Sequence, residues 1–349
     1  MATELVYIGK ILDLVPVPDA EKIELATVVC GKGGKWRGIV KKGQYQTGDL
    51  ARTYLPDSLL PHDDEFAFME KYKWRVRQMR FRGVPSECLI MPDPVSNEKE
   101  DGNGLGIIGR DITDWAKVTK YFKPIPASLE GIAIGNFPSF IPKTDEPNYQ
   151  TVPYMLEALK GQRFYSTEKV DGGSATIYWK DEHFGICSRN QEIAEPNMLN
   201  GRRPVNNAIW DIARRYNLKE KMSVYTDCNT AIQFEVIGPG IQKNPSGLRQ
   251  IEPRLFSVWD IDAQEYWSGA RVRHLSENLK IPMVNILLWD EEFTQDYIDL
   301  LPLQAEGEYE NGHQREGIVV RPMIEQYIGR ERLSFKIVNL LYKDNLGKS

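Results

Sequence analysis

Glu168-Lys-Val-Asp-Gly-Gly173 is the stretch of this 349-residue chain that decides the predicted fold. It stands just before an alternating run at 175–179 that is typical of a strand. Taken alone, Lys-x-Asp-Gly is a weak signal, because background composition produces it in roughly one such chain in ten. Its simplest interpretation is a β-turn with a solvated lysine. The choice between a β-turn and a functional site that contains this lysine therefore depends on the rest of the sequence.

Four further stretches follow this one along the chain. They are Phe234-Glu-Val-Ile-Gly-Pro-Gly-Ile-Gln-Lys-Asn244, Leu255-Phe-Ser-Val-Trp-Asp-Ile261, Arg315-Glu-Gly-Ile-Val-Val-Arg-Pro322 and Leu333-Ser-Phe-Lys-Ile-Val-Asn339. With 168–173 they resemble, in order, motifs I, III, IIIa, IV and V of the covalent nucleotidyltransferases, the superfamily of RNA ligases, DNA ligases and capping enzymes. The Gly238-Pro-Gly-Ile-Gln242 tail resembles the RNA-ligase branch. The ordered set makes the resemblance specific, whereas any single motif would not.

The residue types also make chemical sense as a site for a nucleophilic lysine. A lysine that attacks the α-phosphorus of ATP must be a neutral amine, yet free lysine has a pKa near 10.4. Lowering that pKa to ~7 requires about 5 kcal/mol of differential stabilisation from nearby cations and burial. Arg321, Lys336 and a bound Mg²⁺ would supply that positive field, and would neutralise charge as pyrophosphate leaves.

The resemblance implies a role for each matching residue. Lys169 resembles the nucleophile, and Lys336 and Arg321 complete the predicted catalytic set. Asp171, Glu235 and Glu316 would gather Mg²⁺ or Mn²⁺ through water, because Mg²⁺ keeps much of its hydration shell. The predicted nucleotide-binding set is Glu168, Lys169, Arg189, Glu235, Trp259, Glu316, Arg321 and Lys336, with ATP as the nucleotide.

Three of these assignments have particular grounds. Arg189, in Cys187-Ser-Arg-Asn190, resembles the motif Ia arginine that holds the nucleotide, and Glu168 would help to read the base. Trp259 matches the aromatic position that stacks on adenine, although the alternative is a core aromatic. Phe256 is the second candidate, and its odd separation from Trp259 would turn it to the opposite side of a strand.

Motif V departs from the family pattern. It often contains Lys-x-Lys, but here Lys336 has Ser334 two positions before it and Val338 two positions after it, so one lysine is missing. If the missing lysine normally contacts the phosphate, Arg321 or Lys343 must substitute for it, or one contact is absent.

Residues 1–125 have a different pattern, with short alternating runs separated by turn residues. The runs at 23–30, 36–40 and 50–55, with Gly31-Lys-Gly-Gly34 between the first two, predict strands of a small β-barrel. This half also resembles the OB-fold modules appended to tRNA-handling proteins. The matching stretches are Val15–Ala26, Gly48–Leu50, Pro56–Pro61 and Arg80–Ser86. An OB module placed before the transferase domain resembles the nick-sealing RNA ligases of the Naegleria and Deinococcus type.

A basic stretch at 71–82 is the candidate RNA-binding element of this half. Lys71, Lys73, Arg75 and Arg77 fall at period two, so on a strand they would project from one face. Such a cationic stripe with interleaved aromatic residues suits a phosphate backbone. The alternative is a solvated edge strand whose charges prevent aggregation.

The proline-rich stretch 126–150 is expected to be a linker, and 151–349 a nucleotidyltransferase (adenylation) domain of the α+β class, with antiparallel sheets and helices. Helices are expected at 204–218, 275–279 and 291–301. Strands are expected at 175–179, 184–188, 232–237, 255–261 and 318–321.

Composition excludes several other classes of protein. With 44 Lys+Arg against 49 Asp+Glu, the chain is not a histone-like nucleic-acid coat. There is no run of about 18 apolar residues, and Glu4 and Asp13 interrupt any N-terminal apolar segment, so neither a membrane span nor a signal peptide is expected. Four separated cysteines suggest a reducing, intracellular and cytoplasmic location, and the absence of heptads suggests a monomer.

The sequence therefore predicts an ATP-dependent RNA ligase that joins 3′-OH and 5′-phosphate ends at nicks. Its partner would be nicked duplex RNA or RNA with such ends, and lysyl-AMP and RNA-adenylate would be its intermediates. A DNA ligase and a capping-type guanylyltransferase are the alternatives within the superfamily. A non-catalytic RNA-binding protein that kept the fold is the alternative from a different class.

Overall fold

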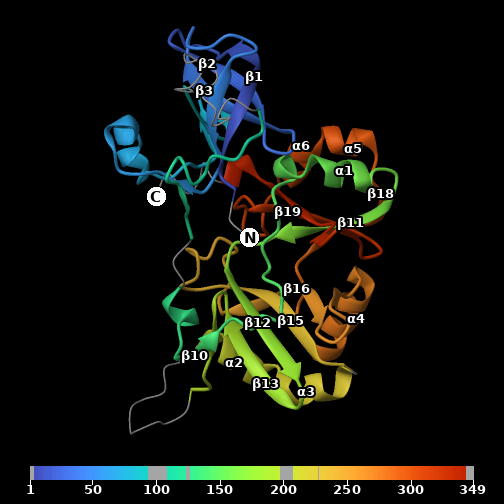
Figure 1. The fold of residues 1–349 in the computed structure, drawn as a ribbon. Helices are drawn as coiled ribbons and strands as arrows, with labels where there is room; N and C mark the ends of the chain where they lie inside the picture. The colour runs from blue at the N-terminus through green and yellow to red at the C-terminus, as the bar shows by residue number, and fades with distance from the viewer. Residues whose placement is uncertain (1–3, 93–107, 123–125, 197–206, 227, 343–349) are drawn as a thin grey trace. The chain divides into compact units, whose positions relative to one another are not determined.

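The computed structural model describes residues 4–92, 108–122, 126–196, 207–226 and 228–342. The chain divides into two compact units (Figure 1). The N-terminal unit contains the described residues up to 122 together with Asn148–Tyr154, and the C-terminal unit contains residues 126–147 and Met155–Tyr342. None of the helices in the described part of the chain is long and apolar enough to cross a membrane.

The N-terminal unit is built on a five-stranded antiparallel sheet with the order β3-β2-β1-β4-β8. Its strands are β1 (Val6–Pro16), β2 (Ile23–Cys30), β3 (Gly34–Lys41), β4 (Leu50–Tyr54) and β8 (Leu89–Pro92). Beyond the sheet lie β5 (Ser58–Leu59), η1 (Asp64–Tyr72), β6 (Met79–Phe81), β7 (Val84–Ser86) and β9 (Thr119–Lys120). The backbone N–H groups of Glu87 and Cys88 donate to the carbonyl of Arg37 in β3. This contact brings the two ends of the sheet together, as an OB-like barrel requires.

Alternating side chains of β1 supply two apolar clusters, one on each side of the sheet. Ile11 packs with Val28 and Trp36 in one cluster. Val6 and Ile8 pack with Phe66 of η1 in the other. The strands predicted at 23–30, 36–40 and 50–55 are confirmed as β2, β3 and β4. Burial alternates in β2 and β3, whereas four of the five residues of β4 are buried.

The predicted strand through the basic stretch is wrong. Lys71 lies in the 3₁₀ helix η1, and Lys73 and Trp74 have left-handed backbone angles, with φ of 55° and 50°. Trp74 stacks on His62 with ring centroids 3.8 Å apart and packs against the cluster that contains Phe66. Burial of this aromatic residue sets the local backbone, so the charge alternation does not correspond to one face of a strand.

The C-terminal unit contains a seven-stranded sheet and a four-stranded sheet. The seven-stranded sheet has the order β10 (Ala133–Asn136), β14 (Gln191–Ile193), β13 (His183–Ser188), β12 (Gly173–Lys180), β15 (Thr230–Ile237), β16 (Glu252–Asp260) and β17 (Glu265–Tyr266). The four-stranded sheet has the order β18 (Ile286–Glu292), β11 (Arg163–Lys169), β19 (Gly317–Pro322) and β22 (Phe335–Val338). Neighbouring strands in both sheets are antiparallel, which confirms the predicted fold class.

Helices and short elements complete this part of the chain. The helices are α1 (Pro153–Leu159), α2 (Ala208–Arg215), α3 (Leu218–Tyr225), α4 (Gly269–Leu279), α5 (Gln295–Asp299) and α6 (Leu301–Ala305). The short elements are η2 (Ala127–Leu129) and the hairpin of β20 (Tyr327–Ile328) and β21 (Glu331–Arg332), whereas η3 (Tyr149–Thr151) belongs to the N-terminal unit. Helix α2 begins after Asn207, whose side-chain oxygen accepts hydrogen bonds from the N–H groups of Ile209 and Trp210.

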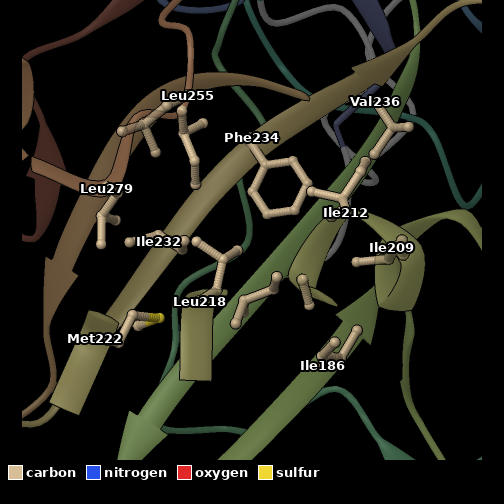
Figure 2. Packing of buried hydrophobic residues seen from close by; sticks show 14 of the residues in the cluster. Ile186, Ile209, Ile212, Leu218, Met222, Ile232, Phe234, Val236, Leu255 and Leu279 are labelled. Carbon is tan, nitrogen blue, oxygen red and sulfur yellow. The ribbon is translucent and has the colours of Figure 1, made fainter. Parts of the chain in front are cut away.

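One face of the seven-stranded sheet is covered by α2, α3 and α4 (Figure 1). Ile232, Phe234 and Val236 of β15 point to this face and pack with Leu218 and Leu279 from the helices (Figure 2). Because side chains alternate along a strand, Gln233 and Glu235 of β15 point to the opposite face. The opposite face therefore carries the polar residues Gln233 and Glu235 toward one end of β15, and a second apolar cluster that includes Ala231 and Trp259 toward the other end.

Two expectations about secondary structure need qualification. The stretch 126–150, expected to be a linker, contains β10, which is hydrogen bonded to β14 at the edge of the seven-stranded sheet. The helix expected at 291–301 is wrong at its start, because Glu291 and Glu292 belong to β18 and pair with β11. Helix α5 begins only after Thr294, whose side chain accepts a hydrogen bond from the N–H of Tyr297.

Replacing Phe234 with alanine tests the core of the seven-stranded sheet. Phe234 is 0% exposed, so the substitution leaves a cavity, and we expect a loss of about 3–5 kcal/mol in the free energy of unfolding. Chemical denaturation followed by circular dichroism measures the change. The control, Ile134→Ala, removes a side chain that is 61% exposed and should stay within about 0.5 kcal/mol of wild type. Equal stabilities of the two variants would contradict this account of the core.

Candidate active site

Lys169 is the last residue of β11 and lies beside the carboxylate of Glu316, the residue that precedes β19. Its Nζ donates to Oε2 of Glu316 at 2.5 Å, and the two side chains are 24% and 15% exposed. Strand pairing explains the contact, because Lys169 lies opposite Gly317, the residue after Glu316. Gly317 has a φ of 151°, and a Cβ there would lie 2.1 Å from the carbonyl oxygen of Ile337. Glycine is therefore needed for this close strand approach.

The register of the four-stranded sheet brings the three predicted catalytic residues to one face. Gly317, Val319 and Arg321 alternate along β19 and share a face. Lys169 pairs with Gly317, and Lys336 of β22 pairs with Val319. Directly opposed residues of an antiparallel pair share a face. Lys169, Arg321 and Lys336 are therefore on the same side of the sheet.

Arg321 is a buried cation with unused hydrogen-bond donors. Its side chain is 2% exposed, and Nη2 donates to Oε1 of Glu146 at 2.7 Å. Among the described residues, its Nε and Nη1 have no hydrogen-bond partner of normal geometry. A buried guanidinium with free N–H groups is suited to receive an anion. Arg321 is thus a candidate ligand for phosphate oxygens.

Glu146 holds Arg321 in place and was not predicted from the sequence. Burial opposes ionisation of Glu146, but the guanidinium groups of Arg321 and Arg332 offset it, so its pKa is lowered. Arg332 is itself paired with Glu325 and donates to the hydroxyl of Ser257 in β16. These contacts connect the four-stranded sheet, the β20–β21 hairpin and the seven-stranded sheet through charged groups.

Asp171 follows β11 and is 5% exposed, and its Oδ2 accepts a hydrogen bond from the hydroxyl of Tyr342 at 2.5 Å. The next residue, Gly172, lies against β15, because a Cβ on it would lie 2.3 Å from the carbonyl oxygen of Val236. Glu235 of β15 pairs with Ser174 of β12 and with Arg254 of β16. Motif I and motif III therefore meet through backbone packing at Gly172.

The three predicted metal-binding carboxylates do not form a direct cage. Within the part of the chain that the structure describes, no three His, Cys, Asp or Glu side chains converge closely enough to hold a metal ion. The donors are nevertheless carboxylate oxygens, which suit Mg²⁺ and Mn²⁺. Asp171, Glu235 and Glu316 therefore fit a hydrated ion reached through water better than an ion bound directly.

Glu168 lies on the other face of the four-stranded sheet from Lys169. It pairs with Ile318, and its Oε2 accepts from Nδ2 of Asn285 at 3.0 Å. Burial raises the pKa of Glu168, although Arg315, the Asn285 hydrogen bond and Arg254 act in the opposite direction. The structure therefore does not bring Glu168 to the face that carries Lys169.

Arg189 lies in a different group of polar residues. It follows β13, and its Nη2 donates to Oδ1 of Asp145 at 2.7 Å in a partly exposed ion pair. A small pocket surrounds it, lined by Phe137, Lys143, Thr144, Asp145, Ser174, Thr176 and Arg189. Ser174 and Thr176 are on the polar face of the seven-stranded sheet, together with Glu235. The pocket therefore offers cations and hydroxyl groups to a ligand on that face.

Trp259 occupies a core position. It is 7% exposed, its Nε1 donates to the carbonyl of Phe140 at 3.0 Å, and its ring packs against Tyr266. Stacking of Trp259 on adenine would require its contacts with Phe140 and Tyr266 to be broken. The structure therefore favours the alternative of a core aromatic.

Phe256 lies at an irregularity of β16. The pairing of β15 with β16 shifts between Gln233 and Phe234, so Phe256 is an extra residue in β16. It packs with the cluster that contains Val170 and Ile237, two residues beside the predicted site. The β-bulge interrupts the alternation from which the orientation of Phe256 relative to Trp259 is predicted.

The predicted RNA-binding cations differ in their surroundings. Lys71, Lys73 and Arg77 are exposed in the N-terminal unit. Arg75 is half-buried, because its guanidinium pairs with Asp57 and stacks 3.7 Å from the ring centroid of Tyr121. Arg75 therefore supports the local fold, whereas the other three cations are accessible.

Comparisons with known proteins agree with this arrangement. A family model described as RNA ligase matches residues 162–338, and an OB-fold domain model matches residues 5–93. The solved structure of Naegleria gruberi RNA ligase with pyrophosphate superposes with a TM-score of 0.83 at 29% identity, covering 100% of both chains. A mutant of that ligase with AMP and Mn gives 0.80 at 30% identity, covering 98% of this chain and 99% of that one. Another mutant, with ATP and Mn, gives 0.80 at 29% identity, covering 98% and 100%.

A search of curated protein sequences found no match. The fold and site define a nucleotidyltransferase domain with an N-terminal OB-fold domain. The chain belongs to the RNA ligase family, and it is an enzyme of that class.

Glu146→Gln tests the buried ion pair with Arg321. Removing one partner leaves a buried charge unpaired, so we expect a loss of about 3 kcal/mol in the free energy of unfolding at pH 7. Because the pKa of Glu146 is lowered from 4.5 in the folded protein, its contribution is present above that value and is lost as pH falls through the folded pKa. The stability difference between wild type and E146Q should therefore shrink below pH 4.5, as measured by urea unfolding. A difference that does not change with pH would contradict the assignment.

Proposed function

We propose that this chain is an ATP-dependent RNA ligase that seals a 3′-OH/5′-phosphate nick, with Lys169 as the residue that becomes adenylated. The observation that supports this most directly is the shared sheet face of Lys169, Arg321 and Lys336 beside Glu316. The Naegleria complexes with ATP, AMP and pyrophosphate add support from a relative.

In the proposed first step, the neutral amine of Lys169 attacks the α-phosphorus of ATP. A P–N bond forms, the bond from the α-phosphorus to the bridging oxygen breaks, and pyrophosphate leaves with the electron pair. Glu316, at 2.5 Å from Nζ, is placed to take the lysine proton. The unused N–H groups of Arg321 and the ammonium of Lys336 would stabilise negative charge on the α-phosphate.

The proposed second and third steps transfer this activation to RNA. An oxygen of the RNA 5′-phosphate attacks the phosphorus of lysyl-AMP, which forms RNA-adenylate and releases the Lys169 amine. The RNA 3′-OH then attacks the 5′-phosphorus, loses its proton and displaces AMP. Arg189 and the hydroxyl groups of its pocket are candidates for holding the phosphate during these transfers.

A divalent ion completes the proposal. Asp171, Glu235 and Glu316 would hold Mg²⁺ or Mn²⁺ through water, and the ion would neutralise phosphate charge. The N-terminal residues 1–125 would act as the RNA-binding domain, and 151–349 as the adenylation domain. Lys71, Lys73 and Arg77 would contact the phosphate backbone, with Arg75 as a support for the surface.

The physiological setting follows from the same proposal. Nicked duplex RNA would be the partner of a monomeric enzyme, and the four cysteines, all of which are free thiols, suit a reducing cytoplasm.

Lys169→Met tests the nucleophile. We expect wild type to become covalently labelled by α-³²P-ATP with Mn²⁺, and the variant to give no labelled band, because methionine carries no attacking amine. Denaturing gel electrophoresis measures the label, and peptide mapping identifies the modified residue. Lys180→Met is a matched control, because Lys180 also stands at a strand end beside a carboxylate. Labelling by GTP in place of ATP, or retention of label in K169M, would refute the assignment.

Removing three exposed cations together tests RNA binding. The Lys71→Ala, Lys73→Ala and Arg77→Ala triple variant loses three phosphate contacts, each of which would release about 0.9 counterion on binding. We therefore expect the slope of log affinity against log salt to become shallower by about 3. Fluorescence anisotropy with a nicked RNA duplex measures the slope. The charge-matched control is the Lys160→Ala, Lys219→Ala and Arg273→Ala triple variant in the C-terminal unit. Equal slopes for both triple variants would rule out a specific role for the 71–77 cations.

A further inference from the structure

The short segment Asn339–Tyr342 follows β22 and contacts two predicted metal-binding positions. At its start, Asn339 is 0% exposed and every polar group of its side chain is engaged. Its Nδ2 donates to the carbonyl of Arg315 at 2.9 Å and to Oε1 of Gln314 at 3.2 Å. Its backbone N–H donates to the carbonyl of Glu316 at 2.9 Å. Asn339 therefore fixes the backbone that carries Glu316.

At the end of the same segment, Tyr342 reaches motif I. It is 5% exposed, and its hydroxyl donates to Oδ2 of Asp171 at 2.5 Å. The hydroxyl is therefore a donor to this carboxylate. Oδ2 of Asp171 is in this way fixed in one direction.

The geometry connects both ends of this segment. The N–H of Leu341 donates to Oδ1 of Asn339 at 2.9 Å, so the residue that holds Glu316 also orients the turn that carries Tyr342. Asp171 and Glu316 are far apart in sequence, yet both accept hydrogen bonds from the same four-residue segment, Asn339–Tyr342.

We propose that Tyr342 is a positioning residue for the adenylation site, acting through Asp171, and that Asn339 anchors it to the strand of Glu316. This inference rests on the proposed function, because it assigns Tyr342 to the carboxylates that would gather the divalent ion. An outer hydrogen-bond partner of this kind typically changes metal affinity by 10–100-fold when it is lost. A carboxylate that is free to rotate would present its oxygens to the hydrated ion in fewer productive orientations.

Tyr342→Phe isolates the hydroxyl from the buried ring. We would place it in a Lys169→Met background, which cannot be adenylated, and titrate it with ATP at fixed Mn²⁺ by isothermal calorimetry. We expect about tenfold weaker binding of ATP with Mn²⁺ than in the K169M parent. In the otherwise wild-type protein, Y342F should need about tenfold more Mn²⁺ for half-maximal labelling, and excess Mn²⁺ should restore most of the labelling rate.

Tyr216→Phe is the matched control. Tyr216 also donates to a carboxylate, Glu252, at 2.9 Å, but it packs against the helix-covered core of the seven-stranded sheet. Both variants lose a tyrosine–carboxylate hydrogen bond, so thermal unfolding should show similar losses of stability. Only Y342F should change the dependence on Mn²⁺. A common loss of stability with no difference in Mn²⁺ dependence would show that Tyr342 is merely structural.

The outcomes separate this inference from the proposed function. If wild type is never labelled by ATP but Y342F still weakens binding of ATP with Mn²⁺ in the K169M background, adenylation at Lys169 fails and the positioning role stands. If wild type is labelled and Y342F binds and responds to Mn²⁺ as its parent does, the positioning role is overturned. Absence of measurable binding in both K169M proteins also overturns it.

Discussion

The register of β11, β19 and β22 is the constraint on which the candidate site depends. It sets Lys169 opposite Gly317 and Lys336 opposite Val319, so that Arg321 shares their face. Because side chains alternate with period two, a slip of one residue in either pair would turn a cation to the other face. The close strand contact at Gly317 excludes any larger residue and so helps to fix that register.

Charge burial is the second feature that shapes this site. Arg321 is almost fully buried, and Glu146 satisfies only part of its guanidinium. An unsatisfied buried donor costs stability, commonly about 1–3 kcal/mol. A protein built only for stability would pair these donors, so their availability suits a site that receives an anion. Glu168 is a second charged group of this domain that burial destabilises, because burial raises its pKa and disfavours its charged form.

The two faces of the seven-stranded sheet differ along β15: one face packs against helices over its whole length, and the other carries polar residues of the candidate site at one end. On one face, the alternate residues of β15, including Phe234, pack against helices (Figure 2). On the other face, Glu235 and Gln233 stand among polar side chains of neighbouring strands. A single strand therefore supports the core and the site at once, which is possible because its side chains point alternately to opposite faces.

The sequence by itself determined the order of the motifs, the antiparallel α+β class, the barrel strands and the identity of Lys169 as the candidate nucleophile. The fold class and the strands follow from alternation and turn residues, whereas the motif order and the role of Lys169 follow from the resemblance to the covalent nucleotidyltransferases. Tertiary structure alone decided that Trp259 is a core residue, that β16 has a bulge at Phe256, and that residues 71–77 do not form a strand. It also revealed Glu146 and Tyr342 as partners of Arg321 and Asp171. These contacts join residues more than a hundred positions apart, and no local periodicity encodes which distant group will satisfy a buried charge.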